Sequence, residues 1–560
     1  MLQLRLRGLE EPEHSTGRRS ARDAEGWQIY WVVCAPYDAA RTLSMMAVGS
    51  SNDFDLVVLG AGTGGYTAAF RAAQLGLKVA LVDEDKIGGT CLHRGCIPTK
   101  ALLESAGFVD RVRHAKDFGL DLPGEPEIDY AQMAARRDAV VKRMWTGVKS
   151  LITKNKVTWI EGRGRLDGPN KIRVSQPGED GTPGKGGERI LQATDVILAT
   201  GSRVKSLPGL EPDGKRIVTS DDVLKMSTLP KDIVIVGAGA VGVEFASMYH
   251  DVGVKVTVLE YLPNIVPLED LEVSKVVQRS FEKRGITVMT NARFDAKAVS
   301  KEKAGICVMV GPEGKEQSEL RAEMMLVATG RAANIEDIGL ETTKVETDRG
   351  VIKVNGHMRT KEPHVYAIGD IVGGLWLAHV AAHEGITAAH TIAGESDVHE
   401  MDYDAQPRAT YCRPEIASIG KTEEQVKAAG TPYKVGKVPF QAIAKAIIYG
   451  EYEGFAKVIS NPETQDTLGV HIVGPHATDA SAMRSVACGP MMWTPRVSSV
   501  AWSAMTFAKP SYSPTMIALA IAWNGTRPTL TSKPFSSACC WVRPIDAISG
   551  RQYVARGCFT

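Results

Sequence analysis

Short apolar runs, glycine-rich turns and helical patterns follow one another in the first part of the chain. The apolar run at 54–59 leads into a glycine-rich turn at 60–65, and a helical pattern continues over 66–75. A second apolar run at 79–82 then ends in Asp83. Short apolar runs bounded by glycine are typical of strands buried in a parallel sheet. The pattern therefore predicts a strand, a tight turn, a helix and a second strand.

The same order of elements returns near the middle of the chain. An apolar run at 233–236 leads into a second glycine-rich turn at 237–242, and a helical pattern continues through Tyr249. The strand predicted at 256–259 ends in Glu260. Elements in this order form the nucleotide-binding unit of doubly wound α/β sheets. The chain is therefore predicted to be an α/β protein with two Rossmann-like dinucleotide-binding domains.

Both turns have glycine at the three positions of the G-x-G-x-x-G pattern. These are Gly60, Gly62 and Gly65 in the first copy and Gly237, Gly239 and Gly242 in the second. Glycine there lets the backbone approach a pyrophosphate at the helix N-terminus. The carboxylate that ends the second strand, Asp83 or Glu260, can accept a hydrogen bond from a ribose hydroxyl. Two such sites in one chain imply two bound dinucleotides.

Glu260 also indicates which nicotinamide cofactor the second site takes. A carboxylate accepts from a free ribose 2′-hydroxyl but repels a 2′-phosphate. The residues that follow it are Tyr261, Leu262 and Pro263, with no arginine cluster. The second site is therefore predicted to bind NAD rather than NADP.

Three further fragments end apolar strands. They are Ala-Thr-Gly at 199–201, Ala-Thr-Gly at 328–330 and Ile-Gly-Asp at 368–370. Each pattern alone is common at strand ends. Their order along the chain is informative, because the first two lie where each predicted nucleotide-binding region ends and the chain continues into the next part.

Cys91 and Cys96 are separated by four residues and follow the first glycine-rich turn. In a regular α-helix two residues at this spacing have Cα atoms roughly 8–9 Å apart, whereas a disulfide requires less than about 7 Å. Gly95 provides the backbone freedom to interrupt the helix. Pro98 fits the first turn of a new helix, which places Cys96 near the positive end of the helix dipole and favours a thiolate. The pair predicts a redox-active disulfide against a flavin; the alternative is two unrelated buried cysteines.

Composition excludes several other classes of protein. The 66 basic and 65 acidic residues nearly balance, so no strong field favours nucleic acid or a membrane surface. No apolar run approaches the roughly 18 residues of a membrane-spanning helix. The nine cysteines show neither a disulfide framework nor a zinc spacing, so no metal site is predicted. One catalytic disulfide among free cysteines fits a reducing, cytoplasmic compartment.

Both ends of the chain differ from the middle. Residues 1–50 precede the first strand and are expected to form a disordered extension; Met45 and Met46 favour an over-extended start. After Asp479 the chain contains one acidic residue, Asp546, and lacks clear periodicity. A shifted reading frame near this point would explain the change. Between the ends, the glycine- and proline-rich stretch at 177–187 is expected to form a long hairpin loop.

The cysteine motif, both glycine turns, both Ala-Thr-Gly fragments and Ile368-Gly369-Asp370 resemble those of the pyridine nucleotide–disulfide oxidoreductases. Within them the chain is most similar to the dihydrolipoyl dehydrogenases, from about Asp53 to about Asp479. The segments at 408–420 and 468–475 resemble the first part of the family's dimerisation domain.

The resemblance implies a division of the chain into parts. It implies a split FAD-binding domain at 51–198 and 330–400, an NAD-binding domain at 199–329, and an α+β dimerisation domain at 401–479. That last domain is expected to be incomplete, with an anomalous segment at 480–560.

The resemblance also implies roles for individual residues. FAD is expected on the first glycine turn and on Asp370, with Lys100 beside the flavin ring and Glu244 as its ion-pair partner. Cys91 is the outer cysteine, which exchanges with dihydrolipoamide, and Cys96 lies nearer the flavin. The positions expected to bind FAD or NAD are Gly60, Gly62, Gly65, Asp83, Gly89, Thr90, Lys100, Gly164, Thr200, Gly201, Gly237, Gly239, Gly242, Glu244, Glu260, Gly330, Asp370 and Ala378.

The implied reaction oxidises protein-bound dihydrolipoamide and reduces NAD⁺, as in the E3 component of 2-oxo acid dehydrogenase or glycine cleavage complexes. Their lipoyl domains are the expected partners. In the family a histidine–glutamate pair of the partner subunit supplies the base, so a homodimer is expected. This chain has Lys-Pro-Ser-Tyr-Ser-Pro-Thr at 509–515 instead. We therefore expect a weakened dimer, and we assign the role of the catalytic base to no residue of this chain.

Two other functions compete with this hypothesis. One is a non-catalytic or diaphorase-only flavoprotein, which the missing base favours. The other is a mercuric reductase-like enzyme, which the vicinal pair Cys539-Cys540 favours. Glu260 disfavours the NADP-dependent mercuric and glutathione reductases.

Overall fold

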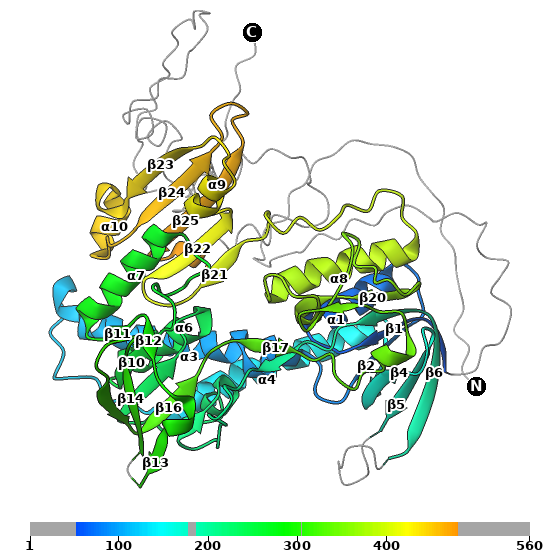
Figure 1. The fold of residues 1–560 in the computed structure, drawn as a ribbon, viewed down its shortest axis with the longest axis horizontal. Helices are drawn as coiled ribbons and strands as arrows, with labels where there is room; N and C mark the ends of the chain where they lie inside the picture. Colours follow the sequence, from blue (N-terminus) through cyan, green and yellow to red (C-terminus); the bar gives the residue numbers. More distant parts are fainter. Residues whose placement is uncertain (1–51, 177–185, 304, 480–560) are drawn as a thin grey trace, which may run out of the picture. The chain divides into compact units, whose positions relative to one another are not determined.

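The computed structural model describes residues 52–176, 186–303 and 305–479 (Figure 1). The N-terminal extension, most of the predicted loop at 177–187 and the segment at 480–560 lie outside the described residues. The strands at either side of that loop, β5 (Lys171–Ser175) and β6 (Glu188–Leu198), pair antiparallel, as the hairpin prediction requires. Among the described helices none is both long and apolar enough to cross a membrane.

The first sheet contains a parallel core, in the order β3-β2-β1-β6, to which β20 is added beside β6. Leu59 lies opposite both Val82 and Leu198, so these strands end at one edge. The bounds are β1 (Asp53–Leu59), β2 (Val79–Asp83), β3 (Thr158–Glu161), β4 (Arg163–Leu166) and β20 (Val365–Ala367), with β4 and β5 continuing the sheet beyond β6 in antiparallel pairing.

Both faces of β1 are buried, which explains its continuous apolar sequence. Leu56 and Val58 pack in the cluster that contains Ala68 of helix α1 (Thr63–Gln74). Val57 and Leu59 lie in the cluster on the other face. Helix α8 (Ala378–Ala393) packs against α1, so elements far apart in the sequence lie together at the first sheet (Figure 1).

Helix α1 begins three residues before the helical pattern predicts. Gly62 is its N-cap, and Gly64 and Gly65 already belong to its buried first turn. The apolar pattern does not detect this turn because glycines carry no side chain to mark a helix face.

The second sheet is also parallel, in the order β11-β10-β9-β16-β8. The predicted strands are present as β9 (Asp232–Val236) and β10 (Lys255–Leu259), joined by α6 (Ala240–Asp251). The other elements are β8 (Ile217–Val218), β11 (Thr287–Met289), β16 (Met324–Val327) and α7 (Leu271–Arg284).

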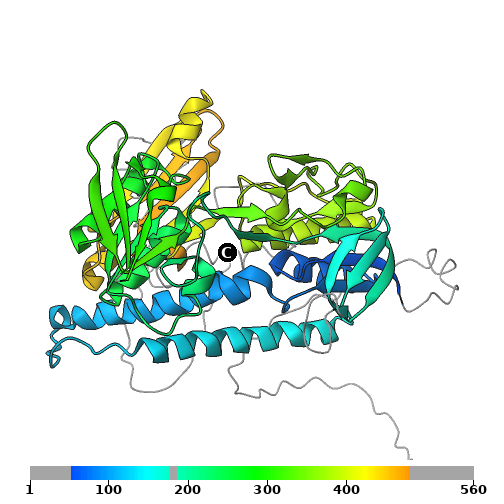
Figure 2. The same cartoon turned by 60° about the horizontal axis from the view of Figure 1, so that its bottom comes forward.

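Two long helices, α3 (Cys96–Arg113) and α4 (Tyr130–Lys154), run side by side (Figure 2). Helix α3 also contacts α6, and Leu102 and Ala106 lie in the same cluster as Phe245 and Tyr249. The helix that follows the cysteine pair is therefore packed against the second nucleotide-binding unit.

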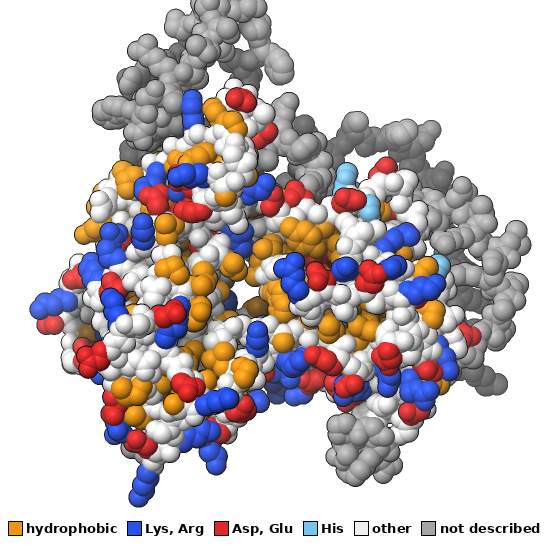
Figure 3. All heavy atoms as spheres, in the orientation of Figure 1, with side chains coloured by type: hydrophobic (Ala, Val, Ile, Leu, Met, Phe, Trp, Pro, Cys, Tyr) orange, Lys and Arg blue, Asp and Glu red, His pale blue; other side chains and the backbone are white. Residues whose placement is uncertain are grey.

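The third sheet is antiparallel, in the order β21-β22-β25-β24-β23. Its strands are β21 (Arg408–Thr410), β22 (Glu415–Gly420), β23 (Lys434–Pro439), β24 (Phe455–Ser460) and β25 (Thr467–Gly474), accompanied by α9 (Glu423–Ala428) and α10 (Ala444–Tyr449). Two parallel nucleotide-binding sheets and one α+β unit confirm the predicted fold class. Lys and Arg side chains are interspersed with Asp and Glu on the face drawn in Figure 3, in keeping with the balanced composition.

One fully buried lysine connects the third sheet to the second nucleotide-binding unit. Lys457 of β24 is 0% exposed, and its Nζ lies 2.9 Å from Asp270, 2.9 Å from Glu272 and 2.6 Å from Glu423. Burial by itself lowers the pKa of Lys457, but hydrogen bonds to the three carboxylates raise it above its usual value. The lysine is therefore charged, and it compensates the buried Asp270, which caps α7.

We predict that Lys457→Met lowers the free energy of unfolding by about 3–5 kcal/mol, because the buried Asp270 carboxylate loses its counter-charge. Lys301→Met is the matched control. It removes an exposed ion pair with Asp213, of 2.8 Å, and is expected to cost less than about 1 kcal/mol. Urea unfolding followed by circular dichroism measures both, and equal midpoints for the two variants would contradict the role of Lys457.

Candidate active site

The first glycine turn lies between β1 and α1. A Cβ on Gly65 would lie 1.8 Å from the carbonyl oxygen of Gly60, so no other residue fits at this position. A Cβ on Gly62 would meet nothing within 4 Å. The middle glycine therefore faces open space at the N-terminus of α1, where backbone N–H groups can hold a pyrophosphate.

Asp83, at the end of β2, braces this turn. Its carboxylate accepts hydrogen bonds from the backbone N–H of Ala61, at 2.6 Å, and of Asp85, at 2.9 Å. Burial raises the pKa of Asp83, and these two hydrogen bonds oppose the shift. A carboxylate offers about four acceptor positions, so capacity remains for a ribose hydroxyl.

The second turn repeats this geometry between β9 and α6. A Cβ on Gly242 would lie 1.9 Å from the carbonyl oxygen of Gly237, while Gly239 faces open space. Glu260, 7% exposed, accepts from the N–H of Ala238 at 2.7 Å and of Leu262 at 2.8 Å. The two carboxylates thus occupy equivalent positions, as their place in the sequence predicts.

An arginine that the sequence does not reveal lies beside Glu260. The guanidinium of Arg293 stacks 3.5 Å from the ring centroid of Tyr261 and donates to the Tyr261 carbonyl at 2.7 Å. Arg293 also pairs with Glu313 at 3.3 Å. It ends β12 (Ala292–Arg293), far along the chain from Glu260, so reading the residues that directly follow Glu260 misses it.

The cysteines lie on two helices that meet at Gly95. Helix α2 (Gly89–Arg94) carries Cys91, the backbone breaks at Gly95 with φ −146° and ψ −111°, and α3 begins at Cys96 itself. This confirms that the segment is not one regular helix and that Pro98 lies in the first turn of α3. Both cysteines are free thiols in this structure. The structure thus describes the pair in its dithiol form, and the disulfide of the resting protein stays a prediction.

The two thiols differ in acidity. The hydrogen bond from Cys91 lowers the pKa of Cys96 against the effect of burial, and the positive charge of Lys100 lowers it further. The same hydrogen bond raises the pKa of Cys91, with burial adding to the rise. The pair therefore favours a thiolate on Cys96 and a protonated Cys91.

Lys100 is held one turn along α3 from Cys96. Its Nζ donates to both carboxylate oxygens of Glu244, at 2.9 and 2.8 Å. Glu244 is 5% exposed and also accepts from the backbone N–H of Tyr411 at 2.9 Å. The structure brings together the predicted pair, and it adds Tyr411, which the sequence places only in the dimerisation segment.

Asp370 follows β20 in a short 3-10 helix (Gly369–Val372). Ser202 donates its hydroxyl to this carboxylate, and Arg331 donates to Ser202 at 2.7 Å. The N–H of Gly369 donates to Glu384 at 2.6 Å. Burial raises the pKa of Glu384 to about 7. These three supporting residues have no local sequence signal, because their partners come from distant elements.

Most of the remaining predicted positions lie close to the first glycine turn or at the start or end of a strand or helix. A Cβ on Gly164 would lie 2.7 Å from the Leu59 side chain, and one on Gly89 would lie 2.5 Å from the Cα of Gly62. Thr200 donates its hydroxyl to the Asn334 carbonyl at 2.7 Å. The others are Thr90 within α2, Gly201 and Gly330 with positive φ, and Ala378 as the first residue of α8.

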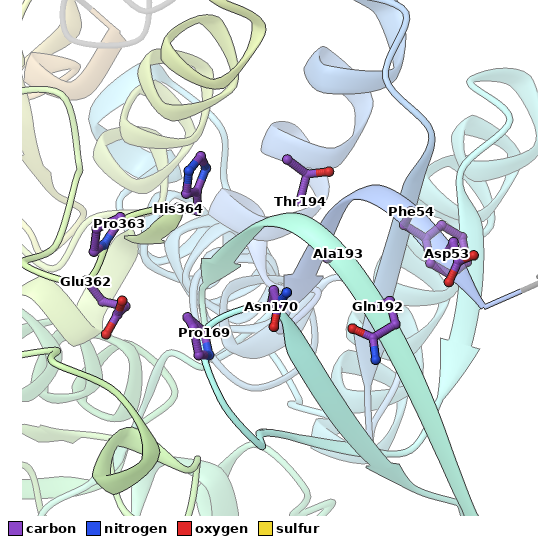
Figure 4. A pocket seen from close by; sticks show the side chains of 10 residues that line it. All are labelled: Asp53, Phe54, Pro169, Asn170, Gln192, Ala193, Thr194, Glu362, Pro363 and His364. Atoms are coloured by element: carbon purple, nitrogen blue, oxygen red, sulfur yellow. The ribbon is translucent and has the colours of Figure 1, made fainter. Parts of the chain in front are cut away.

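A cavity of about 620 Å³ lies away from these residues (Figure 4). Its lining includes Asp53 at the start of β1, Gln192 of β6, and Glu362 and His364 just before β20. These positions mark the amino-terminal edge of the first sheet, opposite the glycine turn. Within the described residues no cluster of three or more His, Cys, Asp or Glu side chains is placed to hold a metal ion.

A family model described as pyridine nucleotide-disulphide oxidoreductase matches residues 54–385. A second, described as the dimerisation domain of the same family, matches residues 406–515. The chain therefore belongs to the pyridine nucleotide-disulphide oxidoreductase family, and the second match indicates a homodimer. That match continues beyond Asp479, the boundary that composition predicts.

Individual proteins agree with this assignment. The chain is 48% identical to a dihydrolipoyl dehydrogenase of Bacillus subtilis over 77% of this chain and 90% of that protein. It is 42% identical to a dihydrolipoyl dehydrogenase of Rhizobium etli, with the same coverage. The crystal structure of LpdA from Mycobacterium tuberculosis is similar with a TM-score of 0.71 and 28% identity, over 80% of this chain and 98% of that chain.

We predict that Gly242→Ala weakens NAD⁺ binding at least about tenfold, because the new Cβ displaces the second turn. Bound flavin should remain, since the first turn is untouched. Gly147→Ala is the control, because a Cβ there meets nothing within 4 Å inside α4. Isothermal titration with NAD⁺ and the flavin absorbance measure the two sites separately. Unchanged NAD⁺ affinity in Gly242→Ala would place the nucleotide elsewhere.

Proposed function

We propose that this chain is a dihydrolipoyl dehydrogenase, which oxidises protein-bound dihydrolipoamide and reduces NAD⁺ with FAD as the resident cofactor. The observation that carries the proposal is the cysteine pair itself. Cys96 begins α3 beside Lys100 and Glu244, while α2, which carries Cys91, starts against Gly62 of the first glycine turn. The named relatives in Bacillus subtilis and Rhizobium etli support the same activity.

The residues present fit both cofactors. Gly62 and the N-terminus of α1 leave open space for the FAD pyrophosphate, with Asp83 for its ribose and Asp370 for the flavin side chain. Gly239 and Glu260 offer the same arrangement to NAD. When bound, FAD would supply the electron acceptor for the cysteine pair, and NAD⁺ would supply the final hydride acceptor.

The cysteines perform a balanced exchange. The two thiols of dihydrolipoamide lose two electrons and two protons and form the lipoamide disulfide, while a Cys91–Cys96 disulfide gains them and becomes the dithiol. Cys91 is assigned as the cysteine that forms the mixed disulfide with substrate. Cys96 then leaves as a thiolate, which the N-terminus of α3 and Lys100 stabilise.

We also propose lipoyl domains of 2-oxo acid dehydrogenase or glycine cleavage complexes as partners, a weakened homodimer, and a cytoplasmic location. The base that takes the substrate proton would come from the partner subunit. Positions 509–515, where the resemblance expects it, lack histidine and lie outside the described residues. This favours, as a second candidate, a diaphorase-only flavoprotein. The Cys539-Cys540 pair of the mercuric reductase hypothesis is also outside the described residues.

We predict that the purified chain oxidises NADH with an artificial electron acceptor but turns over dihydrolipoamide slowly. A missing general base costs typically about 10²–10⁴-fold, whereas the NADH half-reaction requires only residues before Asp479. Stopped-flow reduction by NADH and steady-state lipoamide assays measure the two halves. Cys91→Ser is the control that should abolish the remaining lipoamide turnover and leave NADH oxidation. Full lipoamide turnover would show that another residue serves as the base.

We predict that NADH is preferred over NADPH and that Glu260→Ala narrows the difference. Loss of the buried carboxylate removes a repulsion of the 2′-phosphate worth about 1–3 kcal/mol. Arg293, which stacks on Tyr261, then provides a positive charge near the site that attracts the phosphate. Titration with each nucleotide measures the affinities. A double variant with Arg293→Ala should restore part of the preference, and equal affinities in the unmodified protein would contradict the assignment of NAD.

A further inference from the structure

We propose that Tyr411 is a positioning residue for Cys96, whose aromatic ring holds the Lys100 ammonium in the orientation that stabilises the thiolate. The inference rests on the proposed function, because it concerns the same cysteine pair. It adds a residue from the third sheet to a site otherwise built by the two nucleotide-binding units.

Three elements distant in sequence meet at this point. Lys100 belongs to α3, Glu244 to α6, and Tyr411 to the connection between β21 and β22. The Nζ of Lys100 lies 4.8 Å from the centroid of the Tyr411 ring. An ammonium at this distance from a ring is attracted by the negative face of the π-system, and more strongly when water is excluded.

The Tyr411 ring and the Glu244 carboxylate both attract the Lys100 ammonium, but they differ in the charge that they add to the site. Glu244 takes two N–H donors of the ammonium, and its Oε1 also accepts the N–H of Tyr411. Glu244 carries a negative charge, which raises the pKa of Cys96 and so opposes the thiolate. The ring attracts the same ammonium without adding a negative charge to the site. It therefore fixes Lys100 while leaving the positive charge effective on Cys96.

The charged and titratable groups that act on Cys96 come from every element around it. They are Cys91 of α2, Lys100 of α3, Glu244 of α6, Tyr66 of α1 and Tyr411. Burial raises the pKa of both Tyr66 and Tyr411, so both phenols are neutral at physiological pH. Lys100 is consequently the one cation among these groups, and its position decides how far the thiolate is stabilised.

The experiment compares Tyr411→Phe with replacement of Tyr411 by pentafluorophenylalanine. The two rings have similar shape, but fluorination reverses the charge distribution of the face. Every variant keeps the backbone N–H that binds Glu244. The rate of Cys96 alkylation by iodoacetamide, followed by peptide mass spectrometry across pH in the reduced protein, reports the thiolate without turnover.

Tyr411→Phe should behave as the unmodified protein. The fluorinated ring should lower the alkylation rate of Cys96 near neutral pH on the order of threefold and shift its pH midpoint upward, because the thiolate loses part of its stabilisation. The thiolate-to-flavin charge-transfer band of the two-electron-reduced protein should weaken in parallel. Tyr411→Leu should give the same result as the fluorinated ring.

Tyr449→Leu is the matched control. Lys445 lies 5.4 Å from the Tyr449 ring in an exposed pair of the same kind, remote from the cysteines, and Tyr449 is 42% exposed. This variant should leave the pH midpoint unchanged. Identical midpoints for the phenylalanine and fluorinated proteins would overturn the inference. Lipoamide turnover no faster than that of Cys91→Ser would instead count against the proposed function, and the alkylation comparison would still be readable.

Discussion

The ion pair between Lys100 and Glu244 is the constraint on which the rest of the site depends. It joins the helix that carries Cys96 to α6 of the second nucleotide-binding unit. Glu244 also accepts the backbone N–H of Tyr411, between β21 and β22 of the third sheet. A carboxylate this deeply buried is tolerated only when its charge is compensated. Lys100 supplies this compensating charge, and it must also lie near the Cys96 sulfur to stabilise a thiolate. The stability of the fold and the chemistry of the site therefore require the same position of Lys100.

Lys457 meets the same requirement at a second junction. Its three carboxylate partners come from the start of α7 and from α9. Neither Lys457 nor Asp270, both 0% exposed, could be buried alone. Both junctions use a lysine of one unit and acidic residues of another. Apolar contacts such as those of Leu102 with the Phe245 cluster add area, but the charged pairs specify which surfaces meet.

The sequence predicts what local patterns encode. The two glycine turns, their carboxylates and the break at Gly95 are fixed by a few consecutive residues, and each was found where the pattern indicates. The sequence does not reveal Tyr411, Arg293, Ser202 or Glu384, because each acquires its role from a partner on another element. Arg293 shows the limit clearly. It lies beside Tyr261 because the backbone N–H of Ala292 donates to the Glu260 carbonyl, a contact that the residues next to Glu260 in the sequence do not indicate. The start of α1 was misplaced for a different reason, since glycines leave no trace in an apolar pattern.

Asp83 and Glu260 have a consequence for how the nucleotides arrive. Each carboxylate binds a backbone N–H of its own glycine turn, Ala61 for Asp83 and Ala238 for Glu260. These hydrogen bonds hold both glycine turns in one conformation, so little chain entropy is lost when a nucleotide binds. Nucleotide association should therefore require no conformational change of the glycine turns. Its rate is then set by diffusion and by the orientation of the nucleotide rather than by the ordering of a loop. Exchange of NADH for NAD⁺ then requires no rearrangement of the second sheet, whose strand β10 ends just before Glu260.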